Sequence, residues 1–310
     1  MPGVVVQIEL LGPASTNEDV ALVRAFPRLR TLVISSPRIT DAGIAHLRGL
    51  TNLRTLYLWF SGITNESCGT LKTLTGLREL VLSKTALDDR ALPALAALTN
   101  LRRLDLSATA VGDDGLKPLH RLVKLESLTL DNSKAGNGAL RLAAELRSLA
   151  WLSVQYTKVD DAGLRTLRGL HGLRGLMLGH TAVTDAGLKD LSTLGALTSL
   201  GLDGDAITDA GARTLGKMQR LERLGLDHTR ISDAAMRDVV KLEALRNLSL
   251  QGTDISDAGL MRLVGLRHLR RLLIGHNRLT AAGIRRFKAN MPKVSIIDTS
   301  TWEDAGGRGS

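Results

Sequence analysis

The chain of 310 residues has few aromatic residues, one cysteine and no long apolar run. With only Cys68 present, no intramolecular disulfide is possible, and a reducing compartment is the expected setting. No stretch approaches the roughly 20 apolar residues that span a bilayer. The first residues also lack the basic and apolar segments of a signal peptide. These absences predict a soluble, cytoplasmic protein without a transmembrane segment.

Motifs for catalysis, metal binding and cofactor binding are also missing. The segment "GARTLGK" (211–217) has the glycine spacing of a phosphate-binding loop, but Met218 follows where Ser or Thr is required. No HExxH, CxxC or nucleophile-elbow motif occurs. We therefore expect no enzyme activity, no cofactor and no metal, and Cys68 is interpreted as an inert core thiol.

A repeat of 24 residues organises almost the whole chain. The first repeat starts at Val5, and eleven more follow without insertion or deletion, the last starting at Leu269. Positions 1, 4 and 6 are aliphatic in every repeat. Positions 4 and 6 have the spacing of one strand face, so positions 3, 5 and 7 face the other way. Each repeat therefore predicts one strand of a parallel sheet.

The second half of each repeat predicts a short helix. Positions 16, 19 and 22 are mostly Leu and form an apolar stripe. Position 12 is usually Thr, Ser or Asp, which are helix N-cap residues, and position 13 is usually Asp, which suits a helix amino terminus. Position 15 is usually Gly, which indicates close packing between neighbouring repeats. Stacking of such units buries a common core and curves the stack, with the strands inside the curve.

The repeat resembles the leucine-rich repeat family. The full motif is present in "LRGLMLGHTAVTDAGLKDLSTL" (173–194), and position 9 is mostly Thr, as in bacterial and F-box-associated members. The resemblance implies an α/β fold, a right-handed solenoid or horseshoe with a parallel sheet on the concave face and short helices on the convex face. It also implies a binding role. The Thr at position 9 is expected to satisfy backbone groups in the turn after the strand.

The ends and two repeats depart from the pattern. Residues 1–28 are predicted to form a capping repeat with a capping box at Thr16 and Asp19. Residues 29–292 form eleven repeats, and residues 293–310 hold a strand remnant, a "DAG" echo at 304–306 and a flexible tail. Repeat 6 contains "AGN" at 135–137, and repeat 9 has Asp205 in the Thr position. Either drift, a local bend or a ligand contact explains these two repeats.

The aromatic residues collect at inward positions. "YLWF" places Tyr57, Trp59 and Phe60 at positions 5, 7 and 8 of repeat 3, and Trp151 and Tyr156 take positions 3 and 8 of repeat 7. Large rings on a rigid sheet are typical interface anchors. The alternative is packing of the rings on cross-strand neighbours. We favour binding, because an aliphatic core needs no rings on the opposite face.

Polar residues complete the predicted binding surface. Lys84, Arg103, Asp105 and Asp131 lie between the two aromatic groups, and further partner-binding residues are predicted at inward positions of later repeats: His180, Asp203, Asp227 and His228. His180, His228 and His276 all take position 8, two repeats and about 10 Å apart, which is too far to share a metal. They are solvated surface residues or pH-sensitive contacts.

The net charge of +10 raises the possibility of nucleic acid or an anionic membrane as the partner. Position 2 carries an arginine row: Arg30, Arg54, Arg78, Arg102, Arg174, Arg246 and Arg270. However, the inward positions carry six acids against four bases, so nucleic acid on the concave face is not favoured. The sequence predicts a non-catalytic scaffold for a protein or peptide. The alternatives are the substrate-recognition part of a ubiquitin-ligase-like or host-directed effector, and a non-specific nucleic-acid or anionic-membrane binder using the basic rim.

Overall fold

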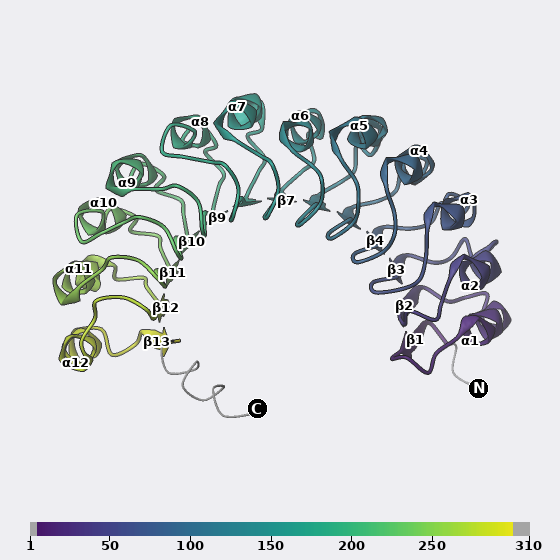
Figure 1. Cartoon of the computed structure of the whole chain (residues 1–310), viewed down its shortest axis with the longest axis horizontal. Helices are drawn as coiled ribbons and strands as arrows, with labels where there is room; N and C mark the ends of the chain where they lie inside the picture. Colours follow the sequence, from purple (N-terminus) through teal and green to yellow (C-terminus); the bar gives the residue numbers. More distant parts are fainter. Residues whose placement is uncertain (1–4, 300–310) are drawn as a thin grey trace. The chain divides into compact units, whose positions relative to one another are not determined.

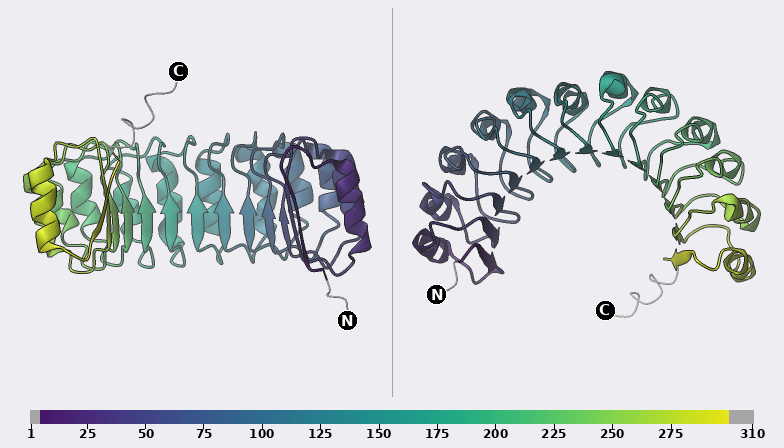
Figure 2. Two further views of the ribbon diagram at one scale, coloured as in Figure 1. Left: turned by 90° about the horizontal axis from the view of Figure 1, so that it is seen from below. Right: turned by 180° about the vertical axis from the view of Figure 1, so that it is seen from behind.

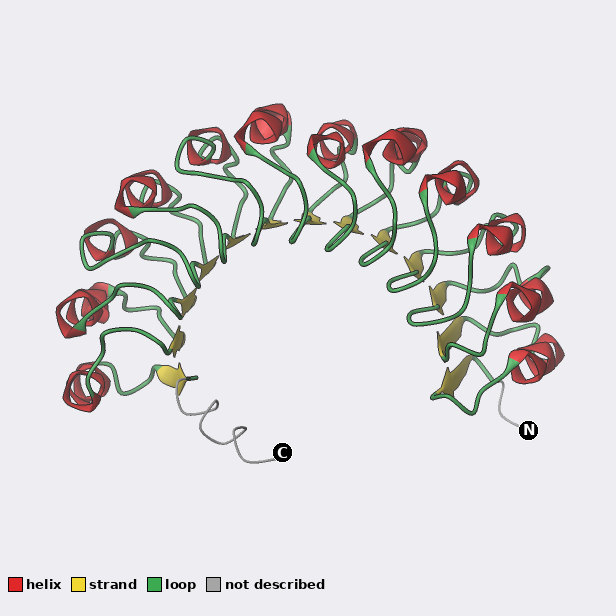
Figure 3. Ribbon diagram, in the orientation of Figure 1, coloured by secondary structure: helices red, strands yellow, loops and turns green. Residues whose placement is uncertain are grey.

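A computed structural model describes residues 5–299 of the chain. They divide into an N-terminal unit that ends at Lys158 and a C-terminal unit that begins at Val159. Within each unit the strands follow the inner side of an arc and the helices its outer side (Figure 1). Every 24-residue repeat supplies one strand, a turn, a short helix and a returning loop (Figure 3).

The N-terminal unit is a parallel sheet in sequence order with one helical segment per repeat. Its strands are β1 Gln7–Leu11, β2 Thr31–Ser35, β3 Thr55–Tyr57, β4 Glu79–Val81, β5 Arg103–Asp105, β6 Ser127–Thr129 and β7 Trp151–Ser153. Its α-helices are α1 Asn17–Leu22, α2 Asp41–Ile44, α3 Cys68–Leu71, α4 Leu92–Leu95, α5 Asp113–Leu116 and α6 Asn137–Glu145. Short 3-10 turns adjoin them at Val23–Ala25, Ala45–Leu47, Asn65–Ser67, Asp89–Ala91 and Lys117–Arg121.

The C-terminal unit repeats the same plan. Its strands are β8 Gly175–Met177, β9 Ser199–Gly201, β10 Arg223–Gly225, β11 Asn247–Ser249, β12 Arg271–Ile274 and β13 Ser295–Asp298. Its α-helices are α7 Asp161–Leu164, α8 Leu188–Leu191, α9 Asp209–Leu215, α10 Met236–Val239, α11 Asp257–Arg262 and α12 Ala281–Asn290. The 3-10 turns are Arg165–Gly169 and Leu263–Gly265.

The strand register equals the repeat length, as the sequence predicts. Leu56 on β3 pairs with Leu80 on β4, which pairs with Leu104 on β5, and Leu200 on β9 pairs with Leu224 on β10. These position-4 side chains are buried between the sheet and the helices. A buried leucine contributes about 1.5–3 kcal/mol relative to an exposed one, so the same core layer is reinforced once per repeat. The predicted parallel-sheet solenoid with short outer helices is confirmed.

The turn after each strand is closed by the residue at position 9. Seven hydroxyls there donate to the carbonyl at position 6 within residues 5–299, with distances of 2.5–2.7 Å. They belong to Ser61, Thr85, Thr109, Ser133, Thr157, Thr229 and Thr253. The predicted role of this threonine is therefore confirmed.

The same turn places position 8 in a left-handed backbone conformation. Eight residues other than glycine have φ between 52° and 59° there, among them Phe60, Tyr156, His180 and His228. This conformation costs an L-residue roughly 1–2 kcal/mol, and glycine adopts it freely. Position 8 therefore carries side chains, several of them large, although glycine would suit the backbone better.

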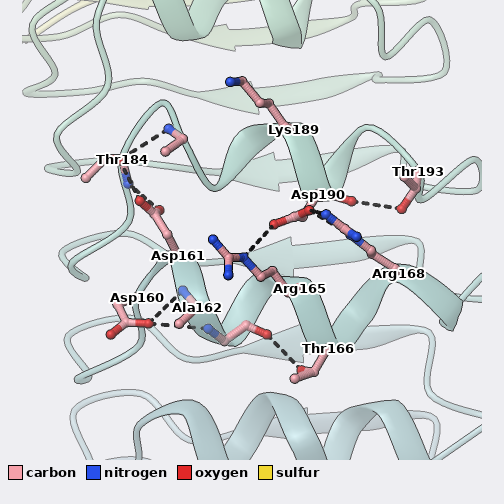
Figure 4. A network of polar contacts seen from close by, with 12 residues as sticks. Asp160, Asp161, Ala162, Arg165, Thr166, Arg168, Thr184, Lys189, Asp190 and Thr193 are labelled. Atoms are coloured by element: carbon pink, nitrogen blue, oxygen red, sulfur yellow. Dashed lines mark hydrogen bonds and ion pairs between the residues drawn. The ribbon is translucent and has the colours of Figure 1, made fainter.

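The acidic residue at position 13 joins each repeat to the next. In the C-terminal unit, Asp161 accepts hydrogen bonds from the backbone N–H and the hydroxyl of Thr184, at 2.8 and 2.6 Å (Figure 4). The Thr184 hydroxyl in turn accepts from the backbone N–H of Ala186, in the turn that leads into α8. The sequence predicts the cap and the favourable charge, but not this bond between repeats.

The same contact recurs along both units. In the N-terminal unit the pairs are Asn17–Thr40, Asp41–Thr64, Asn65–Asp88, Asp89–Gly112 and Asp113–Gly136. In the C-terminal unit, after Asp161–Thr184, they are Asp185–Thr208, Asp209–Ser232, Asp233–Ser256 and Asp257–Thr280. We call this contact the carboxylate staple, and it includes the asparagine versions.

Glycine at position 15 makes room for the staple. A Cβ on Gly211 would lie 2.2 Å from Oδ1 of Asp185, and a Cβ on Gly259 would lie 2.2 Å from Oδ1 of Asp233. The preceding carboxylate thus occupies the space that a side chain would need. This confirms the close packing that the sequence predicts at position 15.

An ion-pair cluster ties two outer helices of the C-terminal unit together. Asp190 on α8 is buried and accepts from Arg168 Nε at 2.7 Å, and Arg165 Nε lies 3.9 Å from its carboxylate (Figure 4). Lys189, its neighbour in sequence, points away from this cluster (Figure 4). The two arginines therefore offset the burial of one acid on the convex side.

Repeat 6 keeps the fold despite its unusual sequence. Ala135 is buried, and the backbone N–H groups of Gly136 and Gly138 donate to the carboxylate of Asp113 at 2.7 and 2.9 Å. The helix α6 that follows has nine residues, more than the other helices of the N-terminal unit. Glycine N–H groups therefore replace the usual Thr in the staple.

Repeat 9 contains a buried acid in place of the turn hydroxyl. Asp205 is 2% exposed and accepts hydrogen bonds from the backbone N–H and hydroxyl of Thr181, at 2.7 and 3.1 Å. Its Oδ2 has no hydrogen-bond partner within residues 5–299. Burial raises the pKa of Asp205 to about 7, and the charges of Asp203 and Asp161 act in the same direction. The carboxyl is therefore held close to the point of ionisation at neutral pH.

The ends of the described chain differ from the middle. The predicted capping box of Thr16 and Asp19 is present, with Thr16 N–H donating to the Asp19 carboxylate at 2.8 Å, and the apolar side chains of Val6, Leu11 and Leu22 are exposed. At the other end β13 pairs with β12, and Phe287 on α12 is a fully buried ring in the core. The "DAG" echo at 304–306 lies outside the described residues.

The first prediction concerns the carboxylate staple. Asp209 accepts from Ser232 N at 2.8 Å, Ser232 Oγ at 2.7 Å and Ala235 N at 3.2 Å. Asp209→Ala should lower the free energy of unfolding by about 2 kcal/mol, because partly buried donors lose a charged acceptor. Urea unfolding followed by circular dichroism measures the change.

The chain itself offers two controls for this test. Asn17 makes the staple with an amide, so Asp209→Asn should cost clearly less than Asp209→Ala. Asp254 forms an exposed ion pair with Arg278, so Asp254→Ala should change stability by less than about 0.5 kcal/mol. Equal losses for Asp209→Ala and Asp254→Ala would contradict the staple.

The second prediction concerns Asp205 and pH. Its folded pKa of about 7 lies above the ordinary value of 3.8, so the folded chain keeps the proton at pH values where the unfolded chain has lost it. Stability should therefore fall as pH rises from about 4 to about 7 and stay low above that range, by as much as about 4 kcal/mol. Asp205→Thr restores the turn hydroxyl and should remove this loss.

Melting curves at pH 5 and pH 8 measure this effect. The gain from Asp205→Thr should be larger at pH 8 than at pH 5. Thr229→Asp, at the same position of the next repeat, should introduce a similar loss at pH 8. A gain for Asp205→Thr that does not change with pH would show that Asp205 keeps an ordinary pKa.

Candidate binding surface

The side chains at positions 3, 5, 7 and 8 of each repeat form the concave face of the two units. Figure 2 shows the strands that carry them, with loops along both edges. The N-terminal unit contains all of the predicted aromatic anchors and four predicted polar residues. The C-terminal unit contains His180, Asp203, Asp227 and His228.

Tyr57 and Trp59 form a ring pair on repeat 3. Their centroids lie 5.6 Å apart with planes inclined by 44°, and both side chains are partly exposed. Such a tilted pair stabilises each ring, while one side of each remains open to a ligand. The structure therefore brings these two predicted residues together.

A polar chain fixes Tyr57 across three strands. Its hydroxyl donates to Glu79 Oε1 at 2.8 Å, and the other oxygen of Glu79 accepts from Arg103 at 2.5 Å. Burial and Glu79 raise the pKa of Tyr57, whereas the hydrogen bond from Arg103 lowers the pKa of Glu79. Arg103 thus contacts the aromatic group indirectly. The sequence reveals Glu79 as an inward acid, but its pairing depends on rotamers that a repeat pattern does not specify.

Phe60, Lys84 and Tyr156 project from the left-handed turn at position 8. Phe60 is 55% exposed and Tyr156 is 57% exposed. Two large rings are thus offered to solvent at a position whose backbone favours glycine. The left-handed conformation was not predicted, although the many residue types at position 8 are visible in the sequence.

Trp151 lies on β7 in the N-terminal unit. Trp59 belongs to the repeat of β3, and β7 is the fourth strand after β3 in the sheet. Trp151 pairs in register with Ser127 on β6 and is partly exposed. A small neighbour on this side leaves part of the indole uncovered. Trp151 therefore forms a second aromatic point, separate from the Tyr57–Trp59 pair.

The predicted acidic residues are largely engaged by the backbone. Asp131 accepts from Gln155 N at 2.8 Å and from the Ser153 hydroxyl at 2.6 Å. Asp105 accepts from the backbone and hydroxyl of Ser107 at 2.8 and 2.6 Å. These carboxylates satisfy N–H groups at the point where the chain leaves the sheet.

Asp203 and Asp227 do the same in the C-terminal unit. Asp203 accepts from Asp227 N at 2.9 Å, and Asp227 accepts from Gln251 N at 2.7 Å. Burial raises the pKa of Asp203, and the charge of Asp227 adds to the shift. Their structural role leaves only part of each carboxylate for a partner.

A hollow of about 240 Å³ lies on the concave face of the C-terminal unit. Arg223 and Arg271 stand on its position-3 side, and Asp203 stands on its position-7 side. Its floor is formed by Gly201 and Gly225, over which the side chains of Met177 and Asp203 fold. The sequence shows the two glycines at an inward position, but we did not predict a hollow from them.

His180 and His228 alternate with glycines at position 8. A Cβ on Gly204 would lie 2.4 Å from Nδ1 of His180, and a Cβ on Gly252 would lie 2.3 Å from Nδ1 of His228. Each imidazole thus covers the glycine of the next repeat, which explains the spacing of two repeats. Both histidines are exposed, so the other side of each ring is accessible.

Cys68 is buried, as expected for a core thiol. Burial and the charges of Asp41 and Asp88 raise its pKa to about 11, so the reactive thiolate is rare at neutral pH. No helix among residues 5–299 is long and apolar enough to cross a bilayer.

Comparison with known proteins agrees with this architecture. Residues 51–111 match the family model described as leucine rich repeat, and no curated protein matches the chain. Among solved structures, the chain is similar to an internalin of Listeria monocytogenes, with 22% identity, a TM-score of 0.66 and coverage of 94% of this chain and 85% of the other.

Two further structures are similar. Internalin C2 of Listeria monocytogenes has 28% identity and a TM-score of 0.53, with 68% of this chain and 84% of that chain covered. A leucine-rich repeat protein of Leptospira interrogans has 16% identity and a TM-score of 0.54, with 93% and 81% covered. The repeat motif, the stacked strands and helices, and these likenesses together support the resemblance to the leucine-rich repeat family.

Proposed function

We propose that the chain is a non-catalytic scaffold that binds a protein partner through its concave face. The leucine-rich repeat fold is in general a scaffold for protein interaction. The observation that carries the proposal is the placing of the rings. Tyr57, Trp59, Phe60, Trp151 and Tyr156 all retain exposed area on the face opposite the aliphatic core.

The energetics favour a protein partner over a small ligand. Interface hot spots are enriched in Trp and Tyr, and truncation of such a residue typically costs about 2 kcal/mol or more of binding energy. The exposed rings belong to two repeats separated by three intervening strands of the N-terminal sheet. Strands are spaced at roughly 4.8 Å, so this surface is wider than most metabolites.

The arginine row gives little support to the alternative function, in which a basic rim binds nucleic acid or an anionic membrane. Arg54 and Arg270 donate to backbone carbonyls, with distances such as 2.9 Å to Thr51 O and 3.0 Å to Leu269 O. Arg102 is paired with Glu126, and Arg246 lies 3.7 Å from Glu222. Much of the row is therefore occupied by the protein itself, and we rank this alternative below protein binding.

The third prediction tests the aromatic anchors. Wild-type protein, Trp59→Ala and Trp151→Ala are immobilised, and proteins captured from a lysate of the source cells are identified by mass spectrometry. A partner confirmed with purified protein should bind each variant at least tenfold more weakly, because each variant loses a hot-spot ring.

A convex variant provides the control. Lys189→Ala removes an exposed side chain on α8 and should leave binding of the same partner unchanged. The melting temperatures of Trp59→Ala and Trp151→Ala should remain close to that of the wild type. Normal binding by both tryptophan variants would refute the concave anchors, and unfolding of both would show that the rings are structural.

A further inference from the structure

A basic pocket lies outside the concave face, at the edge where each repeat of the N-terminal unit returns to its next strand. It has a volume of about 220 Å³ and is lined by Arg54, Gly76, Arg78, Asn100, Arg102 and Lys124. These residues occupy positions 2 and 24 of repeats 3, 4 and 5. Three arginines at position 2 are thus stacked at successive strand spacings of roughly 4.8 Å.

Arg54 is held rigidly at one end of the pocket. One guanidinium nitrogen donates to Thr51 O, Leu53 O and Gly76 O, at 2.9, 3.2 and 3.2 Å. A Cβ on Gly76 would lie 1.9 Å from this nitrogen, so the glycine leaves space for the guanidinium. A fixed guanidinium loses little entropy on binding a ligand.

The opposite end is also partly ordered. Lys124 Nζ donates to Asn100 Oδ1 at 2.8 Å, and Arg102 forms an ion pair with Glu126. Four cations therefore gather around the pocket, and Glu126 is the carboxylate that pairs with one of them. Like charges at this spacing repel one another.

Arg78, in the middle of the pocket, has no carbonyl or carboxylate partner in the described part of the chain. Its side chain is exposed and makes no hydrogen bond or ion pair within residues 5–299. Its two neighbours in the row are engaged by carbonyls and by a carboxylate, as described above. Arg78 is therefore the member of the cluster with all of its donors available to a ligand.

We propose that this pocket binds the phosphate group of a small phosphate monoester. Guanidinium groups recognise phosphate through paired N–H donors, and a lysine adds a compact charge. A dianion placed at Arg78 relieves the repulsion between the stacked cations. The volume of the pocket accommodates a phosphate group together with the first atoms of the molecule that carries it.

The sequence around the pocket favours a compact ligand over a polymer. After Arg102, position 2 is occupied by Glu126 and then Ala150, so the run of cations ends within the N-terminal unit. A nucleic acid strand would need continued cations along its backbone. The row extends one repeat further, to Arg30, but the pocket gathers its four cations within repeats 3 to 5, which suits a single phosphate group.

The test uses the full chain and inorganic phosphate as the probe. Phosphate is titrated at constant ionic strength, with chloride as the balancing anion, while the arginine side-chain N–H signals are followed by ¹⁵N NMR. We expect saturable shifts at millimolar phosphate in wild-type protein, and at least tenfold weaker binding in Arg78→Gln. Absence of saturable binding to wild-type protein would overturn the proposal.

Control variants separate the pocket from general charge effects. Arg174→Gln removes an exposed arginine at the same position of repeat 8, outside the pocket, and should bind phosphate like the wild type. Trp59→Ala should also bind phosphate normally, because the pocket does not depend on the concave face. Equal weakening by Arg78→Gln and Arg174→Gln would show a non-specific charge effect and refute the site.

Two further arms distinguish the source of the phosphate. A single-stranded DNA oligonucleotide and phosphatidylserine vesicles are tested with wild-type protein and Arg78→Gln. The proposal expects neither to bind more tightly than phosphate through Arg78. Binding of DNA or vesicles that requires Arg78, without saturable binding of phosphate, would replace the proposed monoester with a polymer or a lipid surface.

Discussion

The carboxylate staple is the contact on which the stacking of repeats depends. A parallel sheet and a leucine core hold the inner side of each unit, but most helices of the outer side are only one or two turns long. Such helices have little stability alone. Most of them are held in place because Asp or Asn at position 13 accepts a hydrogen bond from the residue at position 12 of the next repeat, and at most of these contacts a glycine at position 15 leaves room for it. Positions 12, 13 and 15 of the motif thus all contribute to the carboxylate staple.

Most of the fold follows from the sequence because the repeat is regular. Leu56, Leu80 and Leu104 occur at one position of the motif, and a fixed period allows only one register for them. The candidate site is less predictable. The sequence locates Trp59 and Trp151 on the inward face, but the bond between Tyr57 and Glu79 and the hollow above Gly201 depend on side-chain geometry. The repeat pattern constrains the backbone and leaves these rotamers free.

A count of acidic residues at the inward positions overstates the number of carboxylates that are available to a ligand, because several of them are hydrogen-bonded within the protein. Asp131, Asp203 and Asp227 are directed to the concave face, yet each accepts a backbone N–H from the following repeat. The rings are different, because an aromatic side chain has no comparable role in closing the turn. On the concave face of the N-terminal unit the rings of Phe60 and Tyr156 remain more than half exposed, and Glu79 holds Arg103 near Tyr57.

The staple also has a direction, since wherever it forms within a unit position 13 binds the repeat that follows. In repeat 12 this position is Ala281, which has no polar side chain to offer to a successor. An internal repeat carries both groups of the staple, with donors at position 12 for the preceding repeat and an acceptor at position 13 for the following repeat. Duplication or excision of one 24-residue block inside a unit would therefore reconnect matching edges, whereas a block added after repeat 12 would meet an edge without a carboxylate. A single residue at position 13 thus decides whether a repeat offers this contact to the next module.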